Sequence, residues 1–99
     1  MTDAAGRAAS FRGAVAAFVY LLRCADGTLY CGWSTDPDRR LREHRAGTAS
    51  RYTRSRLPVE LAWTARFETR SDAMREEARI KRLPRAAKLA IAARAPARA

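Results

Sequence analysis

The alternation of apolar and polar residues predicts two short β-strands early in the chain, at about 17–23 and 28–33. Both segments are rich in apolar, β-branched and aromatic residues, and Asp26-Gly27 between them is typical of a hairpin turn. Strand side chains alternate between faces, so a loop with an odd number of residues, such as 26–28, places Tyr20 and Tyr30 on one face. A two-residue loop would separate them. With an odd loop, one face carries Tyr20, Leu22, Cys24, Tyr30 and Gly32, and the other carries Val19, Leu21, Leu29, Cys31 and Trp33.

A helix is expected next, from Asp36 to about Ala46. An aspartate can accept a hydrogen bond from a free amide at a helix start, and Pro37 suits the first helical position. Gly47 can adopt the left-handed conformation that ends a helix. Residues 48–57 are expected to form a loop or a short helix around Tyr52.

The second half of the chain predicts a strand at about 59–67 after Pro58, a helix capped by Ser71 that runs to about 83, and a last helix from Pro84 to about 93. We expect Leu61, Trp63, Ala65 and Phe67 on one face of the strand, and Ala73, Met74 and Ile80 on the inward stripe of the first of these helices. The order ββαβαα predicts one α+β domain over 17–93, with a small, mainly antiparallel three-stranded sheet flanked by helices. Residues 1–16 and 94–99 are expected to be flexible tails.

The charge of the chain indicates a polyanionic partner. Twenty basic and ten acidic residues give a net charge of +10. Positions 39–56 contain seven arginines and one acidic residue, Glu43. Positions 79–98 contain seven basic residues and no acidic one. Nucleic acid is the commonest such partner, and a solvated arginine-rich surface is the alternative.

The remaining composition favours a cytoplasmic protein. Arg7 and Arg12 before an apolar run imitate a secretory signal, but Arg23 interrupts the run where small residues are required. No stretch approaches the ~20 apolar residues of a membrane span. Cys24 and Cys31 have no second Cys or His pair, so we expect two free thiols rather than a zinc site.

Five short features, in order, resemble the GIY-YIG endonuclease superfamily: Phe18-Val19-Tyr20, Tyr30-Cys31-Gly32, Arg40, His44 and Glu77. The chain is similar to the small stand-alone members of the YhbQ or UPF0213 type and, more distantly, to the N-terminal nuclease domain of the excision-repair protein UvrC. The resemblance covers about residues 17–93. In this chain Phe18 replaces the first glycine of the motif and Cys31 replaces the isoleucine. Trp33 occupies the position of a lysine in the repair nuclease. An asparagine that often follows the last helix has no obvious counterpart.

This resemblance implies a GIY-YIG fold and hydrolysis of DNA, with a role in DNA repair or processing. It implies that Tyr30 acts as a general base on water, that Tyr20 positions that water, and that Glu77 binds metal. Both tyrosines could equally be packing aromatics on a sheet.

The residue types also suit this chemistry. Arg40 and His44 are four apart on one helix face, so both can point at one phosphate, and a guanidinium contacts two phosphate oxygens at once. His44 is a candidate proton acceptor or phosphate ligand, with an exposed polar side chain as the alternative. Glu77 lies on the inward side of its helix, where a carboxylate requires a partner. That partner is either an arginine or one divalent cation, Mg2+ or Mn2+, whose site the phosphate completes.

A nucleic-acid-binding surface is expected around these residues. A glycine at position 32 lets a backbone or ligand approach closely, and Tyr52 can stack on an exposed base. The other candidates are cations that can contact phosphates, namely Arg39, Arg51, Arg54, Arg56 and Lys81.

The sequence therefore predicts a metal-dependent endonuclease acting on DNA. Two rivals remain: a non-catalytic nucleic-acid-binding module of the same fold, whose ligand could be RNA, and a basic adaptor within a larger assembly.

Overall fold

The computed structural model describes residues 15–94. Three strands form one antiparallel sheet: β1 (Ala17–Arg23), β2 (Leu29–Ser34) and β3 (Glu60–Phe67). The strand order is β2-β1-β3, so β2 and β3 are the edge strands. Four helices complete the domain: α1 (Pro37–Arg45), α2 (Arg51–Arg54), α3 (Arg70–Lys81) and α4 (Arg85–Ala92). The predicted α+β class and element order are confirmed. The tails expected at 1–16 and 94–99 lie outside the described residues, apart from their innermost positions.

The hairpin of β1 and β2 places the two tyrosines on one face. Tyr20 is paired with Gly32, and Leu22 with Tyr30. The amide of Cys24 donates to the Thr28 carbonyl at 2.9 Å, which closes a three-residue loop over 25–27. This loop begins one residue earlier than the expected 26–28, but its length is odd, so the predicted faces are correct.

Strand β3 contains an irregularity that the alternation did not predict. Leu21 is paired with Trp63 but Leu22 with Leu61, so Ala62 is the extra residue of a β-bulge. One extra residue reverses the faces beyond it. Leu61 was therefore wrongly assigned to the face of Trp63. It is 45% exposed, whereas Ala62 packs on the core with Trp63.

Helix α1 begins as predicted, because the Asp36 side chain accepts a hydrogen bond from the Arg39 amide at 3.2 Å and Pro37 follows it. Gly47, at φ 80°, follows its end. Helix α3 begins earlier than predicted, because Thr69 rather than Ser71 accepts the capping hydrogen bond, from the Asp72 amide. It also ends at Lys81, before the expected 83.

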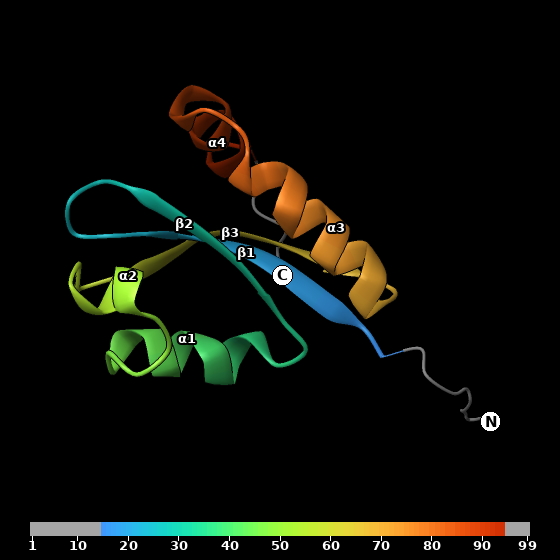
Figure 1. Ribbon diagram of the computed structural model, residues 1–99, viewed down its shortest axis with the longest axis horizontal. Helices are drawn as coiled ribbons and strands as arrows, with labels where there is room; N and C mark the ends of the chain where they lie inside the picture. The colour runs from blue at the N-terminus through green and yellow to red at the C-terminus, as the bar shows by residue number, and fades with distance from the viewer. Residues whose placement is uncertain (1–14, 95–99) are drawn as a thin grey trace.

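Helices cover both faces of the sheet (Figure 1). Helices α3 and α4 lie over the face that holds Val19, Leu21 and Cys31, and their Ala73, Ile80 and Ile91 complete the larger core. Met74, expected on the inward stripe of α3, is 49% exposed. Helices α1 and α2 lie on the other side, next to a smaller cluster. This cluster consists of Tyr20, Leu22, Cys24 and Val59, with Tyr30 and Leu41 against it. In the described range, no helix is long and apolar enough to cross a membrane.

Candidate functional site

Tyr20 lies across the backbone of Gly32, its partner on the neighbouring strand. A Cβ at position 32 would be 2.5 Å from the Tyr20 hydroxyl oxygen and 2.6 Å from Cζ. The close approach expected at Gly32 is therefore made by the Tyr20 ring, which is 4% exposed, and not by a ligand. Gly32 itself is buried, which corrects its assignment to a nucleic-acid-binding surface.

His44 is fully buried at the end of α1. Its Nε2 is 3.0 Å from the Tyr20 hydroxyl, and its Nδ1 is 2.8 Å from Oγ1 of Thr53, a buried residue of α2. Burial, assisted by the charge of Arg40, lowers the pKa of His44, so the ring is neutral at pH 7. Neither an exposed side chain nor a phosphate ligand fits this position. His44 can act on a substrate only through Tyr20.

The two tyrosines differ in their surroundings. Burial raises the pKa of Tyr20 to about 12, although the nearby Arg40 guanidinium opposes this shift. Tyr20 therefore stays protonated near neutral pH. Tyr30 is half-buried, and its ring lies edge-on to His44 with centroids 5.2 Å apart. Within residues 15–94 the Tyr30 hydroxyl makes no hydrogen bond to another protein group, so it is available to a water molecule or a substrate.

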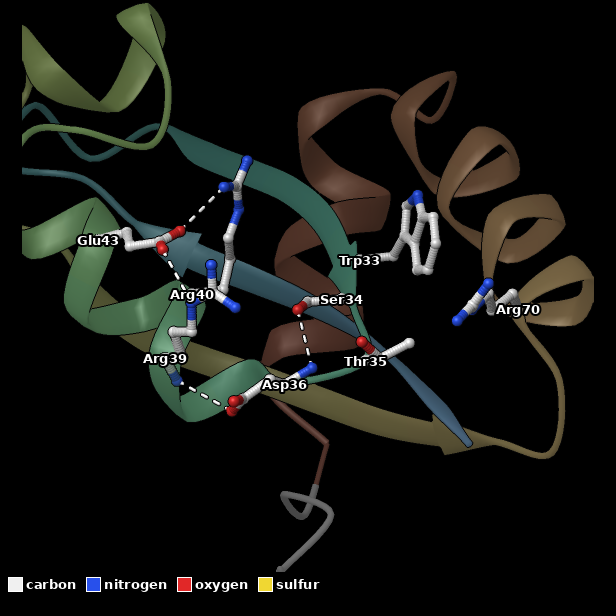
Figure 2. A pocket seen from close by; sticks show the side chains of 8 residues that line it. All are labelled: Trp33, Ser34, Thr35, Asp36, Arg39, Arg40, Glu43 and Arg70. Carbon is white, nitrogen blue, oxygen red and sulfur yellow. Dashed lines mark hydrogen bonds and ion pairs between the residues drawn. The ribbon is translucent and has the colours of Figure 1, made fainter. Parts of the chain in front are cut away.

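Arg40 and Arg39 are held by one carboxylate. Nη1 of Arg40 and Nε of Arg39 lie 3.0 and 3.1 Å from the Glu43 oxygens, and these two arginines hold the pKa of Glu43 below its usual range. Figure 2 shows both arginines beside Glu43, with Trp33 and Arg70 across a pocket at the end of β2. The Arg40 side chain is 39% exposed. The pocket is lined by Trp33, Ser34, Thr35, Asp36, Arg39, Arg40, Glu43 and Arg70.

The helix α2 extends this side of the molecule with aromatic and basic residues. The Tyr52 ring is stacked on Tyr30 with centroids 5.7 Å apart, and the Arg56 guanidinium lies 3.8 Å above the Tyr52 centroid. Arg56 also contacts Asp26 of the hairpin at 3.0 Å. Arg56 therefore covers one face of the Tyr52 ring, although this tyrosine remains 37% exposed. Arg51 and Arg54 are exposed on the same helix.

Glu77 lies apart from this group. Helix α3 packs on the opposite face of the sheet, where the Glu77 carbonyl accepts a weak hydrogen bond from Cys31 Sγ at 3.9 Å. Its side chain is 18% exposed, and among residues 15–94 its carboxylate pairs with Lys81 at 3.3 Å and not with an arginine. Lys81 is thus also separate from the arginines of α1 and α2. The expected meeting of five residues holds for Tyr20, Tyr30, Arg40 and His44. Glu77 lies on the other side of the sheet from these four residues.

Three residues support this site through contacts that were not predicted: Ser50, Thr53 and Glu43. Ser50 caps α2 by accepting from the Thr53 amide at 3.1 Å, a spacing that the sequence Ser50-Arg51-Tyr52-Thr53 could have suggested. No signal in the sequence indicated that the Thr53 hydroxyl would reach His44. Glu43 is the only acid among seven arginines between positions 39 and 56, a contrast that could have suggested an ion pair.

Comparisons with known proteins agree with this fold. Residues 16–90 match the model of the GIY-YIG catalytic domain. The chain belongs to the GIY-YIG family. A UPF0213 protein of Halobacterium salinarum is 52% identical over 73 residues, which cover 74% of this chain and 95% of that protein. A UPF0213 protein of Streptococcus agalactiae is 49% identical over 75 residues, which cover 76% of this chain and 85% of that protein.

Two solved structures also resemble this GIY-YIG domain. The solution NMR structure of a UPF0213 protein from Bacillus halodurans has a TM-score of 0.50 and 41% identity, over 76% of this chain and 80% of that one. A solution NMR structure of a protein from E. faecalis has a TM-score of 0.52 and 45% identity, over 74% of this chain and 78% of that one. Membership of the GIY-YIG family implies a nuclease domain and a nucleic-acid substrate, whereas the UPF0213 names state no activity.

Proposed function

We propose that this GIY-YIG protein hydrolyses phosphodiester bonds of DNA with the help of one divalent metal ion. The observation that carries the proposal is the meeting of Tyr20, Tyr30, Arg40 and His44 on one side of the sheet, next to exposed arginines. Hydrolysis requires a positioned water, a positive charge at the phosphate oxygens and an environment that supports proton transfer.

Arg40 is the residue best suited to bind the phosphate. Its guanidinium stays charged at any working pH and can contact two phosphate oxygens. In the free protein Glu43 occupies it, and an incoming phosphate has to replace this exposed ion pair. Exposed ion pairs contribute little stability, so the exchange is not costly.

The tyrosines divide the remaining tasks. The Tyr20 hydroxyl is committed to His44 and keeps its proton near pH 7, so it is a positioning group rather than a base. The Tyr30 hydroxyl can hold the attacking water. Once it has passed its own proton to solvent, it can accept a proton from that water, which is the general-base role that the family resemblance implies.

Glu77 is the candidate metal ligand, and its chemistry suits Mg2+ or Mn2+. A hard divalent cation commonly uses one or two carboxylates, several waters and substrate phosphates, and within residues 15–94 no group of three His, Cys, Asp or Glu residues offers a fuller site. Glu77 is half-buried, and its present partner is a flexible lysine that can move away. A bound ion would supply charge stabilisation to the phosphate.

The test is incubation of the purified protein with single-stranded, duplex, flapped and branched DNA, with Mg2+, Mn2+ or a chelator. Glu77→Gln should lower the cleavage rate by at least ~100-fold, because a neutral amide is a poor ligand for a hard cation. DNA affinity without metal should stay level or rise slightly. Glu76→Gln is the matched control, since Glu76 is paired with Arg79 and should be dispensable. Equal cleavage by the wild type and Glu77→Gln would refute the assignment.

A non-catalytic nucleic-acid-binding module is the second candidate. The separation of Glu77 from the tyrosines and Trp33 in place of a lysine favour it. Both candidates require electrostatic binding, with log affinity falling by about 0.9 per neutralised phosphate for each unit of log salt concentration. A wild-type protein that binds DNA with such a slope but never cleaves it would establish the binding module.

A further inference from the structure

A continuous chain of hydrogen bonds connects Tyr20 to helix α2. It runs from the Tyr20 hydroxyl to His44 Nε2 at 3.0 Å, from His44 Nδ1 to Thr53 Oγ1 at 2.8 Å, and from Thr53 Oγ1 to Ser50 Oγ at 2.9 Å. The Ser50 carbonyl lies 3.4 Å from Thr53 Oγ1 and is a second acceptor. Tyr20, His44 and Thr53 are all buried. A wrongly placed proton in this chain would therefore leave a polar group unsatisfied away from water.

The neighbours of each end determine the direction of the protons. At the Tyr20 end, the Arg40 guanidinium can only donate, so His44 Nε2 is the acceptor for the Tyr20 proton. At the other end, the Thr53 hydroxyl has Ser50 Oγ and the Ser50 carbonyl as acceptors. It can therefore give its proton to Ser50 and accept one from His44. The Tyr20 end therefore requires a neutral His44 with its proton on Nδ1, and the Thr53 hydroxyl is placed to accept that proton.

We propose that Ser50 and Thr53 are positioning residues that fix His44 as the Nδ1–H tautomer and so aim the Tyr20 hydroxyl proton at Nε2. The oxygen lone pairs of Tyr20 then face Arg40. The Tyr20 oxygen then presents a hydrogen-bond acceptor of fixed orientation to Arg40, which lines the pocket. The effect on catalysis rests on the proposed function, whereas the tautomer does not.

The chain contains one histidine, so the tautomer can be read directly. We would label the full chain with ¹⁵N-histidine and record long-range ¹H–¹⁵N correlations at pH 7.5. The expected result is one neutral ring with a protonated Nδ1 and an unprotonated Nε2. A wild-type ring that is mainly protonated on Nε2 would overturn the proposal.

Substitutions at position 53 separate the role of the hydroxyl from that of the side-chain volume. Thr53→Val keeps the shape but removes the hydroxyl, and should raise the population of the Nε2–H tautomer. Thr53→Ser should keep the wild-type spectrum, as should the control Ser55→Ala, because Ser55 caps the same helix without contacting His44. Thr53→Ala replaces the valine variant if the extra methyl group prevents folding. Unchanged tautomer populations without the hydroxyl would contradict the proposal.

The same variants connect the tautomer to activity. Thr53→Val should lower kcat by about 10- to 100-fold at unchanged KM, the size of effect seen when outer partners of metal-binding histidines are removed. Thr53→Ser should restore the rate. If the wild type cleaves no DNA, the proposed endonuclease activity is wrong, and the NMR experiment still tests the tautomer independently. If the wild type cleaves and Thr53→Val matches it, the positioning role is wrong.

Discussion

Gly32→Ala tests the packing on which the candidate site is built. Alanine would usually stabilise a strand by about 0.5–1 kcal/mol relative to glycine, because glycine loses more backbone freedom on folding. At position 32 the new Cβ would lie 2.5–2.9 Å from three atoms of the Tyr20 ring. Such contacts do not occur in folded proteins, and Tyr20 is 4% exposed with little room to move. The ring would have to leave its place and release His44.

The expected sign of the change follows from the sizes of these effects. Overpacking a core costs about 1–3 kcal/mol, and a broken buried hydrogen bond that leaves both groups unsatisfied costs about 1–3 kcal/mol more. Against the gain of about 0.5–1 kcal/mol from alanine, the net loss should be about 1–5 kcal/mol, a substantial part of the ~5–15 kcal/mol that stabilises a typical domain. For a domain of this size, each kcal/mol lowers Tm by roughly 4–8 °C.

The assay is urea unfolding followed by circular dichroism, in a double-mutant cycle with Tyr20→Leu. Leucine lacks all three atoms that the new Cβ would meet, namely Oη, Cζ and Cε1. In that background Gly32→Ala should be neutral or stabilising, with a coupling energy of about 2 kcal/mol. Gly47→Ala is a control for glycine loss without a clash, since its cost comes from the φ of 80°. Equal destabilisation by Gly32→Ala in both backgrounds would show that the Tyr20 ring is not the obstacle.

Two further predictions concern charge. Glu43→Gln should tighten metal-free DNA binding, because it releases Arg39 and Arg40 from their ion pairs. The slope of log affinity against log salt concentration should steepen by up to about 0.9 for each arginine released. Asp38→Asn on the same helix is the control, and an equal gain in affinity there would exclude a specific release of these arginines. The lowered pKa of His44 predicts that the unfolded chain takes up a proton below about pH 6.5 before the folded domain does, so this contribution to stability is complete above pH 6.5 and is lost on acidification. The slope of the unfolding free energy between about pH 6.5 and 5.5, where most carboxylates of the unfolded chain are still charged, should decrease in His44→Gln. An unchanged slope would mean that His44 takes up its proton as easily in the folded protein as in the unfolded chain.

The sequence predicted the parts of the fold that depend on local signals. Whether two residues of a hairpin share a face depends on whether the loop length is odd or even. Tyr20 and Tyr30 were therefore correctly assigned to one face, although the loop was misplaced by one residue. Helix α1 was correct because Asp36, Pro37 and Gly47 each act within one helical turn. The bulge at Ala62 was missed because it arises from pairing with β1, which the residues of β3 alone do not reveal.

The sequence identified Arg40 and His44 as residues of the candidate site, but it did not predict how deeply each side chain is buried or what it contacts. A helical spacing of four relates Arg40 to His44, yet burial separates them: Arg40 stays accessible, whereas His44 is closed off by α2. That closure depends on the placement of a four-residue helix. No periodicity exists over so short a segment, and so the Thr53 hydroxyl and the neutral state of His44 could be found only in three dimensions.

Glu77 shows the limit of inferring a site from the inward side of a helix. Its place between Ala73 and Ile80 predicted a half-buried carboxylate with a partner, and the structure supplies Lys81. The inward side of α3, however, faces the sheet from the side opposite the tyrosines, so burial alone does not bring Glu77 to them. A substrate shared by Glu77 and the tyrosines would have to pass around β2, and the pocket between α1 and α3 already brings Arg40 and Arg70 together at the end of that strand. A loss of cleavage without loss of binding in Glu77→Gln would agree with a DNA backbone that passes β2 at this end.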